Sequence, residues 1–382
     1  MKKEQKFSKI AVQSPVQGSM GELRDDRHIL FPVLLLVGIG MVMVYSASSA
    51  VALTRFGSDY FFLRKQAIFA AAGIVALVVC RHIPFKLYWH LTYPILIFSM
   101  ILLVVVHIPG IGYKAGGASR WIRIGTFTFQ PSEFARLAII FFMAYSLYKK
   151  QEKIRNFSIG FVPHVLVLAI FGILFHFQPD FGTILIFSVI VWIMMYIGGV
   201  RLLHLATPLI LVAPLLGYIM INASYRLDRI MAFWDPWQYP QDGGYQVIHS
   251  LMAFGSGGLF GAGIGQGYQK LFYLPEAHTD FIFSVIGEEI GLLGVVFIIA
   301  MYVLIIWRGL IIARNTENFY GSLIAAGITT SFALQVCINM GVALGLLPTK
   351  GLTLPFLSYG GTSLLLNMAA IGVLMNIGGT KN

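Results

Sequence analysis

The sequence predicts an all-α integral membrane protein with about ten transmembrane helices and a large extracytoplasmic loop between helices 7 and 8. Of its 382 residues, 57% are hydrophobic and only 11% are charged, whereas a soluble chain carries about 25% charged residues. The mean hydropathy is +0.78. This composition excludes an ordinary soluble enzyme that binds nucleotides or nucleic acid. The net charge of +11 therefore bears on membrane topology.

Ten segments are long and apolar enough to cross a bilayer, which takes about 20 residues in a helix. They are 31–52, 66–81, 87–107, 132–148, 159–177, 181–199, 203–222, 281–306, 319–346 and 356–378. Because backbone N–H and C=O groups must be paired in lipid, each segment is predicted to be a helix. The fifth and sixth are separated only by Gln178-Pro179-Asp180, which indicates a tight turn.

The basic residues predict that both termini are cytoplasmic. With the N-terminus inside, the inner segments hold 16 Lys and Arg residues and the opposite side holds 10. The chain then divides into a cytoplasmic tail, 1–30, and a membrane body, 31–380, with outer loops at 108–131 and 223–280. Two cysteines in apolar runs predict no disulfide framework.

Few ionisable residues lie within the spans, where each costs about 2.5–3.5 kcal/mol to insert. Glu133 and Arg136 lie three residues apart at the start of the fourth span, so they share one helix face. A structural ion pair and the lining of a polar cavity are both open interpretations. Glu288 and Glu289 are adjacent in the eighth span and point about 100° apart, so they cannot both face one partner.

Asp280 ends the large outer loop where the eighth helix is predicted to begin. Asp and Thr are both preferred at helix N-termini, so Asp280 is a candidate cap. If Thr279 supplies the cap instead, the Asp280 carboxylate is left to face a cavity and act in catalysis.

Several short motifs lie in the predicted loops and at the ends of the predicted helices. They are QPSE at 130–133, QPD at 178–180, FWDPW at 233–237, GYQ at 244–246, GSGG at 255–258, QKLFYLPEAHTD at 269–280, GEE at 287–289 and PTKGLTLPFLSYGG at 348–361. Together they closely resemble the SEDS family, the membrane proteins of shape, elongation, division and sporulation, over about residues 25–378. The stretch around Lys350 is more similar to division-type and sporulation-type members than to elongation-type ones.

The resemblance implies a peptidoglycan glycosyltransferase that polymerises lipid II into β-1,4 glycan strands at the outer face of the cytoplasmic membrane, for septal synthesis in cell division. It implies a class B penicillin-binding protein transpeptidase and other division proteins as partners. By position, Asp280 matches the family's essential outer-loop aspartate, and Glu133 with Arg136 matches its acidic–basic pair. Trp121, beside Arg120, matches a functionally sensitive tryptophan.

The implied reaction requires one general base. An α-linked pyrophosphate donor that yields a β-1,4 bond is inverted, so Asp280 alone can remove the acceptor's hydroxyl proton. The departing pyrophosphate needs nearby cations. The candidate substrate-binding or cavity residues are Lys114, Arg120, Trp121, Glu133, Arg136, Lys270, His278 and Lys350. A divalent cation, Mg²⁺ or Mn²⁺, is a further candidate at the pyrophosphate.

Two alternatives belong to other functional classes. A lipid II flippase predicts a polar path through the full membrane, whereas most of the charged candidates here lie in the outer half. A non-catalytic division scaffold predicts that Asp280 is only a helix cap, so that Asn would replace it without loss.

Overall fold

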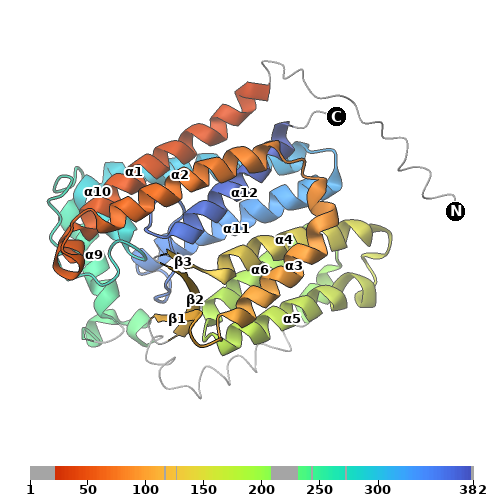
Figure 1. Cartoon of the computed structure of the whole chain (residues 1–382), viewed down its shortest axis with the longest axis horizontal. Coiled ribbons are helices and arrows are strands. Elements are labelled where there is room, and N and C mark those ends of the chain that lie inside the picture. The colour runs from red at the N-terminus through yellow and green to blue at the C-terminus, as the bar shows by residue number, and fades with distance from the viewer. Residues whose placement is uncertain are drawn as a thin grey trace.

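The computed structural model describes residues 22–115, 118–125, 127–207, 231–241, 244–271 and 273–379. Long helices run side by side along the longest axis of the molecule (Figure 1). They are α1 (Glu22–Phe56), α2 (Phe61–His82), α3 (Leu87–Val105), α4 (Pro131–Lys149), α5 (Val162–Phe177), α6 (Phe181–Ile197), α10 (Ile282–Asn315), α11 (Phe319–Ala343) and α12 (Gly361–Gly379). Within the described ranges, seven helices are long and apolar enough to cross a membrane.

The helices overlap nine of the ten predicted spans, and the seventh, 203–222, lies mostly outside the described residues. Three helices begin five or more residues away from the predicted starts of their spans. Helix α2 begins at Phe61, because its first turn holds charged residues that an apolar window excludes. Helix α12 begins at Gly361, because the apolar run before it is a loop in which Phe356 packs inside the bundle against Phe332. Helix α1 begins at Glu22, inside the predicted tail 1–30.

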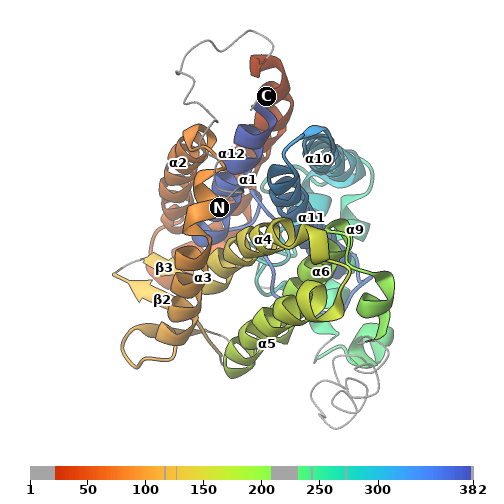
Figure 2. The same ribbon diagram turned by 90° about the vertical axis from the view of Figure 1, so that its right-hand side faces the viewer.

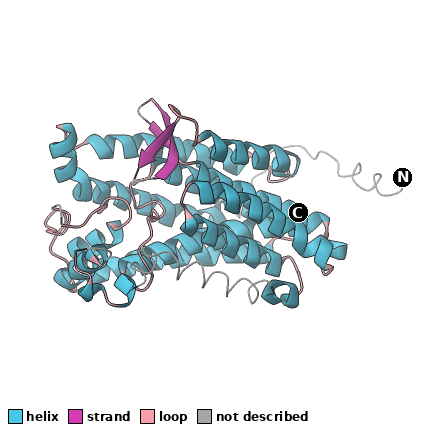
Figure 3. Ribbon diagram, turned by 90° about the horizontal axis from the view of Figure 1, so that it is seen from below, coloured by secondary structure: helices cyan, strands magenta, loops and turns pink. Residues whose placement is uncertain are grey.

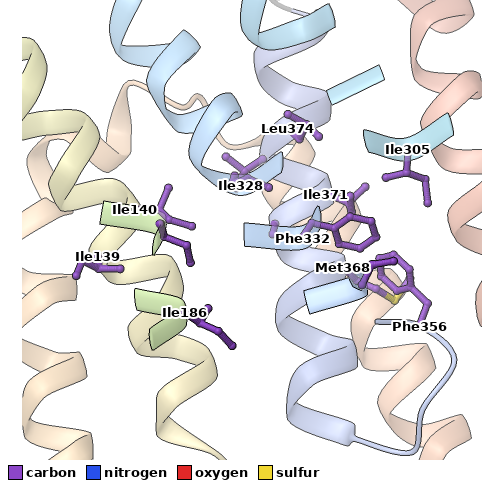
Figure 4. Packing of buried hydrophobic residues seen from close by; sticks show 14 of the residues in the cluster. Ile139, Ile140, Ile186, Ile305, Ile328, Phe332, Phe356, Met368, Ile371 and Leu374 are labelled. Carbon is purple, nitrogen blue, oxygen red and sulfur yellow. The ribbon is translucent and has the colours of Figure 1, made fainter. Parts of the chain in front are cut away.

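Helix α4 lies at the centre of the bundle, where it packs against α3, α6, α11 and α12 (Figure 2). Its sequence explains the start, since Pro131 occupies the first turn, where no N–H is needed, and Glu133 favours the helix N-terminus. Figure 4 shows part of the core, with Ile140 and Ile186 on one side and Phe332 with Ile371 on the other. The central helix therefore carries its polar N-terminus into the middle of the molecule.

The predicted outer loop 108–131 contains a small antiparallel sheet, which an all-α prediction did not include. Its strands are β1 (Gly112–Ala115), β2 (Ala118–Ile124) and β3 (Phe127–Phe129), in the order β1-β2-β3. Figure 3 shows the sheet at the margin of the helices. Tyr113 lies opposite Trp121 across the first pair of strands, so both are held at defined positions.

The described part of the predicted outer loop 223–280 folds back onto α10. It contains η4 (Pro236–Gln238) and α9 (Tyr245–Gly257), and α9 packs along α10. Helix α10 is broken at Gly291, whose φ of 73° suits glycine. The segment after α9 pairs with this break: Leu292 N donates to Gly258 O over 2.9 Å, and Ala262 N donates to Glu288 O over 2.9 Å. The backbone groups freed by the break are thereby paired again.

Helices α1 to α6 alternate in direction, and so do α10 to α12, so the α1–α2, α3–α4, α5–α6 and α11–α12 connections and the start of α10 gather at one end of the bundle (Figure 1). We call this the loop end. It carries the sheet and the residues predicted to be functional.

Candidate functional site

A cavity of about 420 Å³ opens at the loop end. This volume lies within the range of about 300–1,000 Å³ that is typical of small-molecule sites. Five segments contribute to its walls: α2, the sheet, the start of α4, the residues before α10, and the α11–α12 loop. The lining residues are Lys65, Phe69, Tyr113, Arg120, Trp121, Phe127, Thr128, Gln130, Glu133, Glu276, Thr279, Asp280, Gly351, Leu352, Thr353, Tyr359, Gly360 and Gly361.

Asp280 lies in the cavity wall and does not cap α10. The N-cap of α10 is Phe281, which has no side-chain capping bond, and Thr279 donates its hydroxyl to a Glu276 carboxylate oxygen over 2.8 Å instead. Within the described part of the chain, the Asp280 carboxylate accepts no hydrogen bond. Burial raises the pKa of Asp280 to about 7, the Glu276 carboxylate adds to this rise, and the Arg120 guanidinium opposes it.

Arg120 on β2 joins the sheet to the α5–α6 turn. Its Nη2 donates to Pro179 O over 2.6 Å, and its Nε donates to Gln178 O over 3.3 Å and lies 3.8 Å from Asp180 Oδ2. The predicted turn at 178–180 is confirmed, and Asp180 caps α6 by accepting from Thr183 N. Trp121, the next residue on the strand, lines the same cavity.

Glu133 and Arg136 form an ion pair of 2.8 Å, and their exposed fractions are 7% and 5%. Glu133 lines the cavity, whereas Arg136 points into the bundle and donates through Nη2 to Asn367 Oδ1 over 3.2 Å. Asn367 in turn donates to Ser363 Oγ, which accepts from Thr353 at the cavity wall. The two residues therefore form a structural ion pair, and one of them, Glu133, also lines a cavity.

Lys350 does not line the cavity itself, but it directly precedes Gly351, which does. Its side chain packs over Gly182 at the start of α6, and its Nζ is buried with no hydrogen-bond partner among the described residues. Burial lowers the pKa of Lys350 to about 8, although the Asp180 and Glu133 carboxylates favour its charged form. A cation in this position favours the approach of an anion.

Lys270 lies away from the cavity. Its Nζ donates to Glu289 Oε1 over 2.6 Å and to Ser46 Oγ over 2.8 Å, in a buried cluster between α1 and α10. Glu288 instead accepts from Tyr268 N over 2.7 Å. The prediction that the two adjacent glutamates face different partners is confirmed. Lys270 thus anchors the loop to the bundle.

His278 does not line the cavity, but it contacts Tyr359, which does. Its ring packs against Phe62 and Tyr359, and its carbonyl accepts from Tyr359 N over 2.9 Å. Burial lowers the pKa of His278, which favours the neutral ring. Lys114 lies in β1, but its side chain is outside the described atoms.

Sequence reasoning missed several cavity residues. Glu276 lies in the motif at 269–280 and Tyr359 in the motif at 348–361, and this position is the signal that marks them in the sequence. Lys65 carries no such signal, because its place depends on how α2 packs beside the sheet.

The chain matches the model of the FtsW, RodA and SpoVE family, described as cell cycle proteins, over residues 27–382. It is 48% identical over 352 residues to the probable peptidoglycan glycosyltransferase FtsW of Trichlorobacter lovleyi, which covers 92% of each chain. It is 41% identical to the stage V sporulation protein E of Bacillus subtilis, covering 92% of this chain and 96% of that protein.

Two solved structures share this fold. The first comes from a study of how a peptidoglycan synthase complex coordinates polymerization and crosslinking, with a TM-score of 0.76 and 27% identity. The second is the rod shape determining protein RodA of Thermus thermophilus, with a TM-score of 0.67 and 27% identity. Each match covers 92% of this chain and 96% of the other.

Proposed function

Because this chain belongs to the FtsW, RodA and SpoVE family of cell cycle proteins, we propose that the loop-end cavity is the site at which it extends glycan strands. The protein is a multi-pass membrane peptidoglycan glycosyltransferase with a role in cell division. One observation carries the assignment of the site. The Asp280 carboxylate accepts no hydrogen bond within the described residues, and it presents a group with a pKa of about 7 to the cavity.

The proposed substrate is lipid II, and the proposed chemistry is a single inverting displacement. The C4 hydroxyl oxygen of the acceptor sugar attacks the anomeric carbon of the donor, and the bond from that carbon to the pyrophosphate oxygen breaks. The hydroxyl proton passes to Asp280, which acts as the general base. A pKa near the working pH suits this role, because about half of the carboxyl groups are then ionised and the ionised form is still basic enough to take a proton.

We assign the stabilisation of the leaving pyrophosphate to Arg120 and Lys350. Arg120 lines the cavity. The buried Lys350 ammonium is close enough to Asp180 for that carboxylate to favour its charged form. Fixed cations that meet developing negative charge lower the barrier most effectively in a water-poor site. Lys114 stays a candidate for the same role, while Lys270 does not, because Glu289 already neutralises it.

A divalent cation, Mg²⁺ or Mn²⁺, remains a candidate cofactor. The described residues hold no group of three metal-ligating side chains, but Asp280 and Glu276 line one cavity, where the Glu276 carboxylate helps to raise the pKa of Asp280. Mg²⁺ is commonly held by one or two carboxylates together with substrate phosphates, so these two residues fit such an ion. When bound, it would neutralise pyrophosphate charge. Chelation with EDTA should then slow polymerisation, and added Mg²⁺ should restore it.

The loop end is proposed to face the outside of the cell. The opposite end carries a cluster of basic residues, Lys149, Lys150, Lys153 and Arg155, which supports a cytoplasmic position for that end and, as we propose, for both termini. A class B penicillin-binding protein is the proposed transpeptidase partner, alongside other division proteins. The likeness to a complex that coordinates polymerization and crosslinking supports it.

The decisive experiment compares wild type with Asp280→Asn in lipid II polymerisation by the full chain and its transpeptidase in liposomes. Moenomycin is added to inhibit contaminating polymerases of the other class. SEDS proteins are expected to be insensitive to moenomycin. Asp59→Asn is the matched control, because Asp59 lies at the same end of the bundle but outside the cavity. The proposal is supported if wild type and Asp59→Asn make long strands and Asp280→Asn makes none.

Equal polymer from wild type and Asp280→Asn would reject Asp280 as the base. If none of the three folded proteins makes polymer, lipid II translocation becomes the assay, because the flippase alternative then gains weight.

A further inference from the structure

A buried amide on α11 holds the backbone of Asp280. The exposed fraction of Asn339 is 1%. Its Nδ2 donates to Asp280 O over 2.9 Å and to Leu352 O over 2.5 Å, so both amide hydrogens are used. The two carbonyls belong to different walls of the cavity, one before α10 and one in the α11–α12 loop. Asn339 therefore connects these two walls through hydrogen bonds, one of which is to the backbone of Asp280.

Gly351 lies against the side chain of the same aspartate. A Cβ on Gly351 would lie 2.9 Å from Asp280 Oδ2 and 3.6 Å from Asp280 Cγ, and its nearest neighbours all belong to that carboxylate. The backbone at Gly351 does not have a positive φ, so an alanine there is not strained by its own conformation. The missing side chain leaves the space that the Asp280 carboxylate occupies.

We propose that Asn339 and Gly351 are positioning residues for glycosyl transfer, Asn339 by fixing the Asp280 backbone and Gly351 by leaving room for its carboxylate. This inference rests on the proposed function, because it assigns Asp280 as the base. A catalytic group must be held within about 0.5 Å of its productive position. Displacement by about 1 Å can cost about 10²-fold in rate.

The chain offers a matched control for Asn339. Gln335 lies one turn earlier on α11 and is also 1% exposed. Its side-chain amide makes no hydrogen bond within the described residues and does not line the cavity. Replacing either amide by Leu removes a buried polar group of similar size. Only the change at Asn339 releases the Asp280 carbonyl.

The test measures initial rates of polymerisation over a range of lipid II concentrations for Asn339→Leu and Gln335→Leu, with the full chain and its transpeptidase in liposomes. We expect kcat of Asn339→Leu to fall at least about tenfold with KM within about twofold, because the base is displaced while substrate binding is kept. Gln335→Leu should keep the wild-type kcat. Thermal unfolding of each variant reports how much folded protein is present.

Gly351→Ala gives a second, independent measurement. It should lower kcat with little change in KM, whereas Gly255→Ala on α9, where an added Cβ meets no atom within 4 Å, should not. An Asn339→Leu protein with wild-type kcat per folded molecule, or a Gln335→Leu protein with an equal loss, overturns the inference. Asp280→Asn distinguishes the two levels: if it is inactive, the proposed function stands even when the positioning roles fail.

Discussion

The Arg120 guanidinium lies 3.8 Å from the Asp180 carboxylate and donates to two carbonyls of the α5–α6 turn. A strand of the sheet is thereby fastened to a turn that is distant in the sequence. The same side chain lines the cavity that Asp280 also lines, so its geometry sets both the shape of the wall and the local charge.

We expect Arg120→Lys to reduce polymerisation at least about tenfold, because lysine keeps the charge but loses the forked donors that hold two carbonyls. Arg123→Lys on the same strand is the control, since among the described residues Arg123 Nε donates to Gly125 O, within its own hairpin. Initial rates with lipid II measure both. Equal rates for the two variants would contradict a role for Arg120.

The rate of polymerisation should rise with pH through about 7 and then level off. Only the ionised form of Asp280 accepts the proton, and burial raises its pKa to about 7. The measurement is kcat between pH 5.5 and 8.5 in liposomes, limits that bracket this pKa by about 1.5 units. A rate that is flat across this interval would mean that another group sets the acid limb.

Asp280 should destabilise the fold at alkaline pH. Its carboxyl is more easily ionised when unfolded, because the folded-state pKa is raised from 3.8 to about 7. The stabilising contribution of the neutral form is present at low pH and is lost as the pH rises through about 7. Asp280→Asn should therefore melt at a higher temperature than wild type at pH 8, with the difference shrinking toward pH 5. A constant difference would contradict the raised pKa.

Lys350→Met should lower activity and raise thermal stability together. The Lys350 ammonium is buried with no hydrogen-bond partner in the described chain, so its removal ends an unfavourable burial of charge. Its loss also removes a cation assigned to the pyrophosphate. Melting temperature and initial rate are measured on one preparation. A variant that is both less stable and fully active would contradict this assignment.

Lys270→Met should destabilise the protein by about 3–5 kcal/mol, because it leaves a buried Glu289 carboxylate without its ion pair. The double variant Lys270→Met, Glu289→Leu should recover most of that stability and retain polymerisation. Denaturant unfolding and initial rates measure the two effects. A stable but inactive double variant would return Lys270 to the substrate-binding residues.

Much of the fold follows from composition, because a chain with few charges and long apolar runs has few ways to pair its backbone in lipid. The sheet and α9 were missed, since both are too short to span a membrane and both are stabilised by contacts with the bundle. The motifs identified Asp280 and Glu133 as site residues, the basic residues of the outer loop added Arg120, and these three share one cavity.

The remaining assignments depend on tertiary contacts that spacing does not reveal. Lys270 looks like a free cation in a loop, but its partners are Ser46 and Glu289 on two other elements. Asn339 looks like an ordinary polar residue in an apolar helix. Its role follows only from the two carbonyls that the fold places beside it.

The five segments that wall the cavity are separated along the chain, and the last of them is the loop between α11 and α12. A nascent chain that has inserted only as far as α11 already contains Arg120 and Asp280, but lacks Gly351 and the Leu352 carbonyl. Biosynthesis itself thus delays the assembly of the site. Truncated products that end at α11 should therefore make no glycan.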